Sequence, residues 1–158
     1  MFRLLAIAAV MLLSSCGFHI QGALTTPAEM QRTYIDTNDP YSLFYRELRV
    51  QLKAAGVDLA DTATDATATF SIYYDETDQR VLSVSARNVP TEYEVYYTIE
   101  YAIDGSTSRL LEKQDLTVTR NYTYDSTLVL GKAREEQLLR EALVKDLVRI
   151  VLKQISTL

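Results

Sequence analysis

The amino-acid sequence predicts an α+β sandwich in which helices cover one face of an antiparallel sheet. Residues 39–56 and 132–155 place apolar side chains at the spacing of one helix face, whereas 68–86, 92–103 and 110–124 favour strands. The elements follow the order strand, helix, two or three long strands and helix. Elements grouped in this order pack as layers around one core.

The first part of the chain predicts two weaker elements and a connection. Residues 17–31 are expected to be an extended lead-in, because Pro27 disfavours regular structure nearby. Residues 33–35 fit a short strand. Residues 58–66 are a polar run of Asp, Thr and Ala, and we expect them to connect the first helix to the long strands.

The first helix is predicted to follow Pro40 and to end before Gly56. Asp39 is the expected N-cap, Pro40 fits the first turn, and Gly56 fits the position after the last turn. Apolar residues recur at spacings of four, four and three, which is one face of a helix. They are Phe44, Leu48, Leu52 and Ala55.

The three long strands are predicted to form an antiparallel meander. Polar residues 76–79 interrupt the apolar face of 68–86, which therefore fits one long strand with a bend or bulge. A loop follows at 87–90, and Asp104–Gly105 is a turn signal. The clearest alternation puts six apolar or aromatic residues on one side of the middle strand: Tyr93, Val95, Tyr97, Ile99, Tyr101 and Ile103.

The last helix is predicted from Lys132 to Ile155. Its apolar stripe is wide enough to lie across a sheet. The stripe consists of Leu139, Leu143, Leu147, Ile150 and Val151, widened by Val144, Val148, Leu152 and Ile155.

The N-terminal residues predict a bacterial lipoprotein signal peptide. Arg3 precedes an apolar run at 4–13, which is shorter than the ~20 residues of a membrane-spanning helix. Two serines then stand directly before Cys16. We expect residues 1–15 to be removed and Cys16 to be acylated, leaving a single periplasmic α/β domain at 16–158. The alternative is an ordinary exported protein whose leader contains a cysteine.

The residue after the predicted anchor indicates which of the two bacterial membranes holds the protein. An aspartate directly after the lipidated cysteine is the usual signal for retention in the inner membrane, and this chain has Gly17 there. The expected location is therefore the outer membrane, on its periplasmic side.

Composition excludes several classes of function. The formal net charge is −5, and about −6 without the leader, so a nucleic-acid partner is not expected because phosphate binding needs clustered positive charge. One cysteine and one histidine leave no disulfide and remove most metal sites and nucleophilic dyads. The sequence predicts no catalytic residue, metal or cofactor.

Short motifs along the chain resemble the LptE family of lipopolysaccharide-assembly lipoproteins. The run Cys16-Gly17-Phe18-His19-Ile20-Gln21-Gly22 is similar to the start of mature LptE proteins, although Gln21 stands where that family usually has arginine. The resemblance continues at 39–40, 91–94 and 130–132 and follows the element order of nearly the whole mature chain. It implies a small two-layer sandwich with two helices on one face of a mostly antiparallel four-stranded sheet.

The resemblance also implies a function. LptE-like proteins plug the outer-membrane β-barrel protein LptD, assist its assembly and bind lipopolysaccharide on its way to the outer leaflet. Arg87, in the loop between two long strands, and Lys132, before the last helix, match the basic positions that this family uses for the lipid phosphates. Cationic side chains form strong hydrogen bonds to phosphate. Taken alone, both residues also fit ordinary solvated charges.

Seven tyrosines could form a contact surface or fill the core, since tyrosine suits both strands and interfaces. Tyr96, on the outward side of the middle strand, is the predicted contact with the barrel. Glu92, Glu94 and Glu100 share its face, and a solvated sheet face explains them better than a catalytic pair, which needs burial. His19 fits a packing or hydrogen-bonding residue better than a metal ligand.

Two other classes of function stay open at this point. One is an accessory lipoprotein of another envelope lipid-transport or cell-wall system. The other is an enzyme, which is disfavoured because the sequence offers no nucleophile, metal cluster or phosphate loop.

Overall fold

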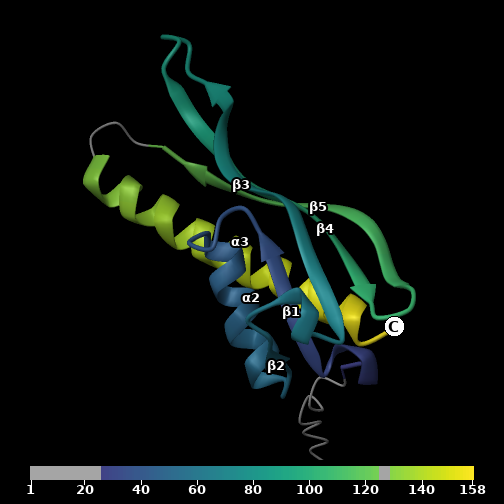
Figure 1. Cartoon of the computed structure of the whole chain (residues 1–158). Helices are drawn as coiled ribbons and strands as arrows, with labels where there is room; N and C mark the ends of the chain where they lie inside the picture. Colours follow the sequence, from purple (N-terminus) through teal and green to yellow (C-terminus); the bar gives the residue numbers. More distant parts are fainter. Residues whose placement is uncertain (1–25, 125–128) are drawn as a thin grey trace, which may run out of the picture.

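The computed structural model describes residues 26–124 and 129–158. In the last helix, side chains are described only after residue 130. The signal peptide, Cys16 and the run that follows it lie outside the described residues. A five-stranded sheet in the order β2-β1-β3-β4-β5 carries two long helices on one face (Figure 1). The elements are η1 (Ala28–Met30), β1 (Arg32–Thr37), α2 (Leu43–Ala54), β2 (Asp58–Leu59), η2 (Ala63–Asp65), β3 (Ala68–Val84), β4 (Pro90–Gly105), β5 (Arg109–Thr123) and α3 (Val129–Ile155).

The α+β fold is confirmed, but the sheet has five strands rather than four. The additional strand, β2, lies in the segment predicted to be a polar connection, and it pairs parallel to β1 through Arg32–Asp58 and Thr33–Leu59. A two-residue strand is too short to show alternation, so the sequence carried no signal for it. β1 is also parallel to β3, whereas β3, β4 and β5 form the predicted antiparallel meander.

The predicted N-cap of the first helix is wrong, although its end is confirmed. Ser42 caps α2, because its Oγ accepts the backbone N–H of Tyr45 at 3.0 Å. Asp39 instead closes the preceding turn by accepting the N–H of Tyr41 at 2.9 Å. Gly56 adopts φ +85° directly after the last turn, a conformation that favours glycine.

The lead-in and the last helix also differ from the prediction at their ends. η1 interrupts the expected extended segment, and its last residue, Met30, is fully buried in the core. α3 begins at Val129, so Lys132 lies inside the helix instead of before it.

A β-bulge in β3 is confirmed and explains the interrupted apolar pattern. The register moves from Ile72–Tyr101 to Tyr74–Glu100, so Tyr73 is the extra residue. Before the bulge the even-numbered side chains face the helices, and from Asp75 to Val81 the odd-numbered ones do. The helix-facing side of β3 therefore changes from apolar residues to Asp75 and polar residues beyond it.

The core lies between the helices and the odd-numbered face of β4. Tyr101 stacks on Phe70 with 5.1 Å between ring centroids, and burial raises the pKa of Tyr101 to about 12. Fully buried side chains from both layers meet there. They include Phe44, Leu48 and Leu52 of α2, Val95, Ile99 and Ile103 of β4, and Leu147, Val151 and Ile155 of α3.

A hydrogen-bonded junction joins the β3 bulge to the start of α2. The carboxylate of Asp75 accepts the hydroxyl of Ser42 at 2.5 Å and that of Tyr97 at 2.6 Å. The Tyr97 hydroxyl in turn accepts the N–H of Phe44 at 3.3 Å. Burial raises the pKa of Asp75 above its usual value, although both hydrogen bonds act in the opposite direction.

This junction predicts a pH dependence of stability. A group whose folded pKa is raised stabilises the fold fully below its unfolded pKa, and that contribution is lost as pH rises through the folded pKa. We expect the unfolding free energy of the wild type, relative to Asp75→Asn, to fall as pH rises above 3.8 and then to level off. Denaturant unfolding at a series of pH values measures this difference.

Asp61→Asn, which removes an exposed carboxylate, is the matched control. A difference that grows with pH for Asp75→Asn would contradict the prediction, because it would mean that the hydrogen bonds from Ser42 and Tyr97 outweigh burial.

Candidate functional site

β3 and β4 continue beyond β1 as a ribbon that β5 accompanies for most of its length and that is two-stranded at its end. β1 pairs with β3 only as far as Ile72, and β5 ends at Thr123, opposite Glu92. The ribbon projects past both helices (Figure 1). We call residues 81–90 the ribbon tip. Its turn is closed by the N–H of Ser85, which donates to the carbonyl of Val89 at 2.8 Å.

Arg87 lies in the turn of the ribbon tip, where the sequence predicted a loop. Its side chain is exposed and has no ion-pair partner among the residues that the structure describes. The neighbouring Asn88 adopts φ +61°, a conformation that asparagine tolerates better than most residues. Arg87 is therefore presented to solvent at the far end of the molecule.

Lys132 occupies a different environment at the base of the ribbon. Its side chain is only 18% exposed, and its Nζ lies 2.7 Å from a carboxylate oxygen of Glu135, one turn along α3. The same Nζ lies 6.0 Å from the centroid of the Tyr122 ring. The ribbon tip, which carries Arg87, and the start of α3, which carries the ion-paired Lys132, lie toward the same end of the molecule (Figure 1).

Three tyrosines form a cluster beside Lys132. Tyr93 stacks on Tyr122 with centroids 5.7 Å apart and meets Tyr124 edge-on at 5.3 Å. Burial, followed by the charge of nearby Glu136, raises the pKa of Tyr122. Its protonated hydroxyl donates to Oε1 of Gln79 on β3 at 2.9 Å. The cluster forms an aromatic surface between α3 and the ribbon.

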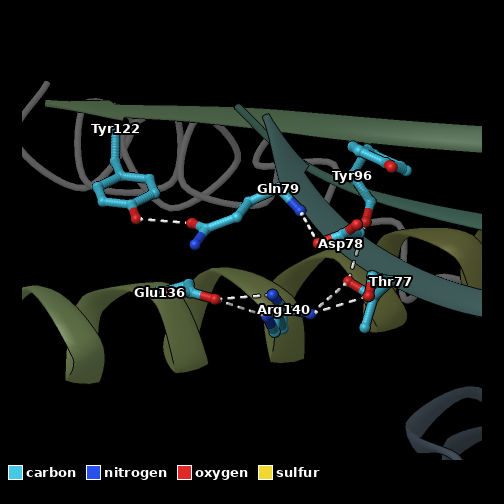
Figure 2. Close-up of polar contacts among 7 residues, drawn as sticks. All are labelled: Thr77, Asp78, Gln79, Tyr96, Tyr122, Glu136 and Arg140. Atoms are coloured by element: carbon cyan, nitrogen blue, oxygen red, sulfur yellow. Dashed lines mark hydrogen bonds and ion pairs between the residues drawn. The ribbon is translucent and has the colours of Figure 1, made fainter. Parts of the chain in front are cut away.

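A polar belt holds the base of the ribbon against α3 (Figure 2). One guanidinium nitrogen of Arg140 donates to both the carbonyl and the Oγ1 of Thr77, each at 3.1 Å. Nε and Nη2 of Arg140 donate to Oε1 of Glu136 at 3.0 and 2.7 Å. The Thr77 hydroxyl continues the contact by donating to the carbonyl of Tyr96 on β4 at 2.9 Å. Sequence reasoning missed Arg140, because its partner is 63 positions away.

Tyr96 lies on the opposite face of the sheet, which carries no helix in the described structure. Its ring is half-buried, with the Arg80 guanidinium 5.8 Å from its centroid. Arg80 also pairs with Glu94, whose side chain is 12% exposed. Glu100 pairs with Lys113 at 2.5 Å. On this face Glu94 and Glu100 are therefore ion-paired, whereas Glu92 is exposed, as expected for a solvated sheet face.

The apolar residues of the ribbon tip are the second feature that sequence reasoning missed. Val81, Leu82, Val84 and Val89 are exposed, although the first three continue the strand pattern of β3. Their signal was a short apolar run after the polar residues 76–79, which fits a buried strand equally well.

Comparison with known proteins identifies the family. A family model named LptE and described as "Lipopolysaccharide-assembly" matches residues 30–155. The chain belongs to the LptE family. It is 26% identical over 165 residues to the LPS-assembly lipoprotein LptE of Pectobacterium atrosepticum, covering 100% of this chain and 86% of that protein. It is 24% identical over 155 residues to LptE of Yersinia pestis, covering 94% and 72%.

Solved structures of similar lipoproteins share the fold. Uncharacterized lipoprotein B of Nitrosomonas europaea superposes with a TM-score of 0.73 at 25% identity, over 89% of this chain and 90% of that one. Rare lipoprotein B of Shewanella oneidensis gives a TM-score of 0.69 at 22% identity, over 80% and 94%. The mixed sheet with two helices is thus the fold of LptE-like proteins, and the expected family is confirmed.

Within residues 26–124 and 129–158, no helix combines the length and apolarity needed to cross a bilayer.

The polar belt predicts a local effect on stability. We expect Arg140→Met to lower the unfolding free energy by about 1–3 kcal/mol, because it removes charge-assisted hydrogen bonds and leaves Glu136 unpaired. It should also speed amide exchange at the ribbon base, around Thr77 and Tyr96, which hydrogen-exchange mass spectrometry resolves. Arg149→Met, which removes a 74% exposed arginine paired with Asp146, is the control. Equal effects of the two changes would contradict a special role for the belt.

Proposed function

We propose that this LptE-family protein is a non-enzymatic outer-membrane lipoprotein that plugs and helps to assemble the LptD barrel and binds lipopolysaccharide for insertion into the outer leaflet. The observation that carries the proposal is that the ribbon tip with Arg87 and the start of α3 with Lys132 lie toward one end of a fold that belongs to a lipopolysaccharide-assembly family. The relatives from Pectobacterium and Yersinia are named LPS-assembly lipoproteins, which supports the same class of ligand.

Arg87 and Lys132 differ in whether they must give up an existing ion pair to bind a phosphate. Arg87 is exposed and unpaired in the described structure, so it can bind a phosphate without losing another contact. Lys132 must first release the carboxylate of Glu135. We therefore assign the larger part of phosphate binding to Arg87 and a secondary part to Lys132.

The helix-free sheet face is the proposed contact with the barrel. Tyr96 lies on this face, and the exposed Tyr74 lies on the neighbouring strand β3. Tyrosine suits such a contact because its ring is apolar and its hydroxyl is polar. The helices bury the opposite face, so the outer face is the broad sheet surface that remains available to a partner.

The proposed anchor is Cys16, after removal of the signal peptide at residues 1–15. Each buried methylene contributes about 0.8 kcal/mol to membrane binding, and two acyl chains are enough for stable anchoring. The first described residue, Thr26, lies ten positions after Cys16 in the sequence.

The proposed phosphate contacts predict a graded loss of ligand binding. Arg87→Glu should weaken binding of labelled lipopolysaccharide to the purified protein more than Lys132→Glu does, and the double variant should abolish it. Each charge reversal replaces attraction to phosphate with repulsion. The matched control is Arg49→Glu with Lys53→Glu, which reverses two cations on α2, away from this end. Unchanged binding by the double variant would remove Arg87 and Lys132 from the site.

The anchor and the barrel contact predict a second pair of results. Metabolic labelling with palmitate should mark the wild type but not Cys16→Ser. In gentle detergent, the wild type should co-purify in a stoichiometric complex with LptD, and Tyr96→Ala should reduce the recovered barrel. A labelled lipoprotein that purifies alone would favour an accessory lipoprotein of another envelope system. Hydrolysis of an envelope substrate by the purified protein would favour an enzyme.

A further inference from the structure

The ribbon tip exposes an unusual group of apolar side chains. Val81, Leu82, Val84 and Val89 are between 42% and 54% exposed. They lie within nine consecutive positions, three at the end of β3 and Val89 in the turn directly before β4. Single exposed apolar residues are common on soluble proteins, but apolar side chains grouped on a projection mark a contact surface.

The described part of the chain does not cover these side chains. The hydrogen bonds nearest the tip are those of Arg140 with Thr77, of Tyr122 with Gln79, and of the Tyr124 N–H with the carbonyl of Thr91, and none of them involves the exposed apolar residues. β5 ends opposite Glu92, so beyond that point the tip is a two-stranded hairpin. An isolated hairpin is marginally stable in water. A ligand that covers the tip would therefore also stabilise it.

The charges of the tip indicate the chemistry of that ligand. Between residues 81 and 91 the only charged residue is Arg87, at the turn. The tip thus combines a cation without a described ion-pair partner with apolar side chains on either side of it in the chain. An added protein strand would cover the free edge of β3 but not Val89, which lies on the other side of the turn. An anionic lipid offers a phosphate for the cation and hydrocarbon for both strands.

We propose that the ribbon tip binds the acyl chains of lipopolysaccharide, with Leu82 and Val84 in contact with hydrocarbon while Arg87 binds a phosphate of the same molecule. This inference rests on the proposed lipopolysaccharide binding and extends it from the phosphates to the lipid. The tip is then a two-part site, in which the apolar residues recognise the chains and the turn recognises the headgroup.

Site-specific photocrosslinking in the full-length chain, expressed in a Gram-negative bacterium, tests the inference. A benzophenone amino acid replaces Leu82, Val84 or Ala86, and in the control it replaces Val50, which is 59% exposed on α2. The mass of the intact adduct identifies the molecule bound. Mild alkali then cleaves ester-linked chains, so a crosslink to such a chain leaves a fatty-acid mass on the protein.

We expect lipopolysaccharide adducts at Leu82 and Val84 that retain a fatty acid after alkali, and none at Val50. Lipopolysaccharide adducts at Ala86 alone would overturn acyl-chain binding but leave the proposed function intact. Polypeptide or phospholipid adducts in place of lipopolysaccharide at Leu82 and Val84 would also overturn the inference. No lipopolysaccharide adduct at any of the three tip positions would overturn the proposed function as well.

A pair of double variants measures the apolar contribution. Leu82→Ser with Val84→Ser should lower the yield of the lipopolysaccharide adduct at Ala86 about tenfold, because two apolar contacts are lost. Val50→Ser with Leu138→Ser changes two exposed apolar residues on the helices and should leave the yield unchanged. Thermal unfolding of both variants checks that they fold. Equal yields from the two variants would overturn the inference.

Discussion

The fold depends on burial of the odd-numbered face of β4 beneath both helices. Val95, Ile99 and Ile103 on this face are fully buried, and each large apolar side chain of this kind stabilises a fold by about 1.5–3 kcal/mol. Beyond Val95, toward the ribbon, polar contacts join the elements: Arg140 of α3 donates to Thr77 of β3, and Tyr122 of β5 donates to Gln79 of β3. The molecule therefore consists of a packed body and a ribbon that polar groups hold in place.

The bulge at Tyr73 determines which side chains of β3 face the helices where the packed body meets the ribbon. A register shift of one residue moves every later side chain to the other face of the sheet. Because of the bulge, Asp75, Thr77 and Gln79 point toward the helices, where Ser42 and the donors of the polar belt contact them. A regular strand would place Tyr74 and Glu76 there instead. The one extra residue thus turns three hydrogen-bond acceptors of β3 toward the helices.

Long periodic segments of the sequence predicted most of the fold, because apolar spacing reflects burial directly. The cap of α2 was less predictable, since Asp39 and Ser42 both suit an N-cap and only tertiary contacts decide between them. At the site, the exposure of Arg87 followed from its place between two strands. The contact of Arg140 with Thr77 did not, because no local pattern connects residues 63 positions apart. The resemblance to LptE predicted the family, but not the apolar tip.

An acidic protein that binds an anionic lipid must keep its own carboxylates away from the ligand. The chain has a formal net charge of −5, yet residues 81–91 contain Arg87 and no carboxylate. The nearest carboxylate along β4 is that of Glu92, five positions from Arg87, a separation of at most about 16 Å along the chain. Charges in water at physiological salt are screened over about 8 Å. A projecting ribbon therefore separates the cation from the acidic body, which a cation on the helices would not achieve. Its apolar side chains add an attraction to hydrocarbon that salt does not screen.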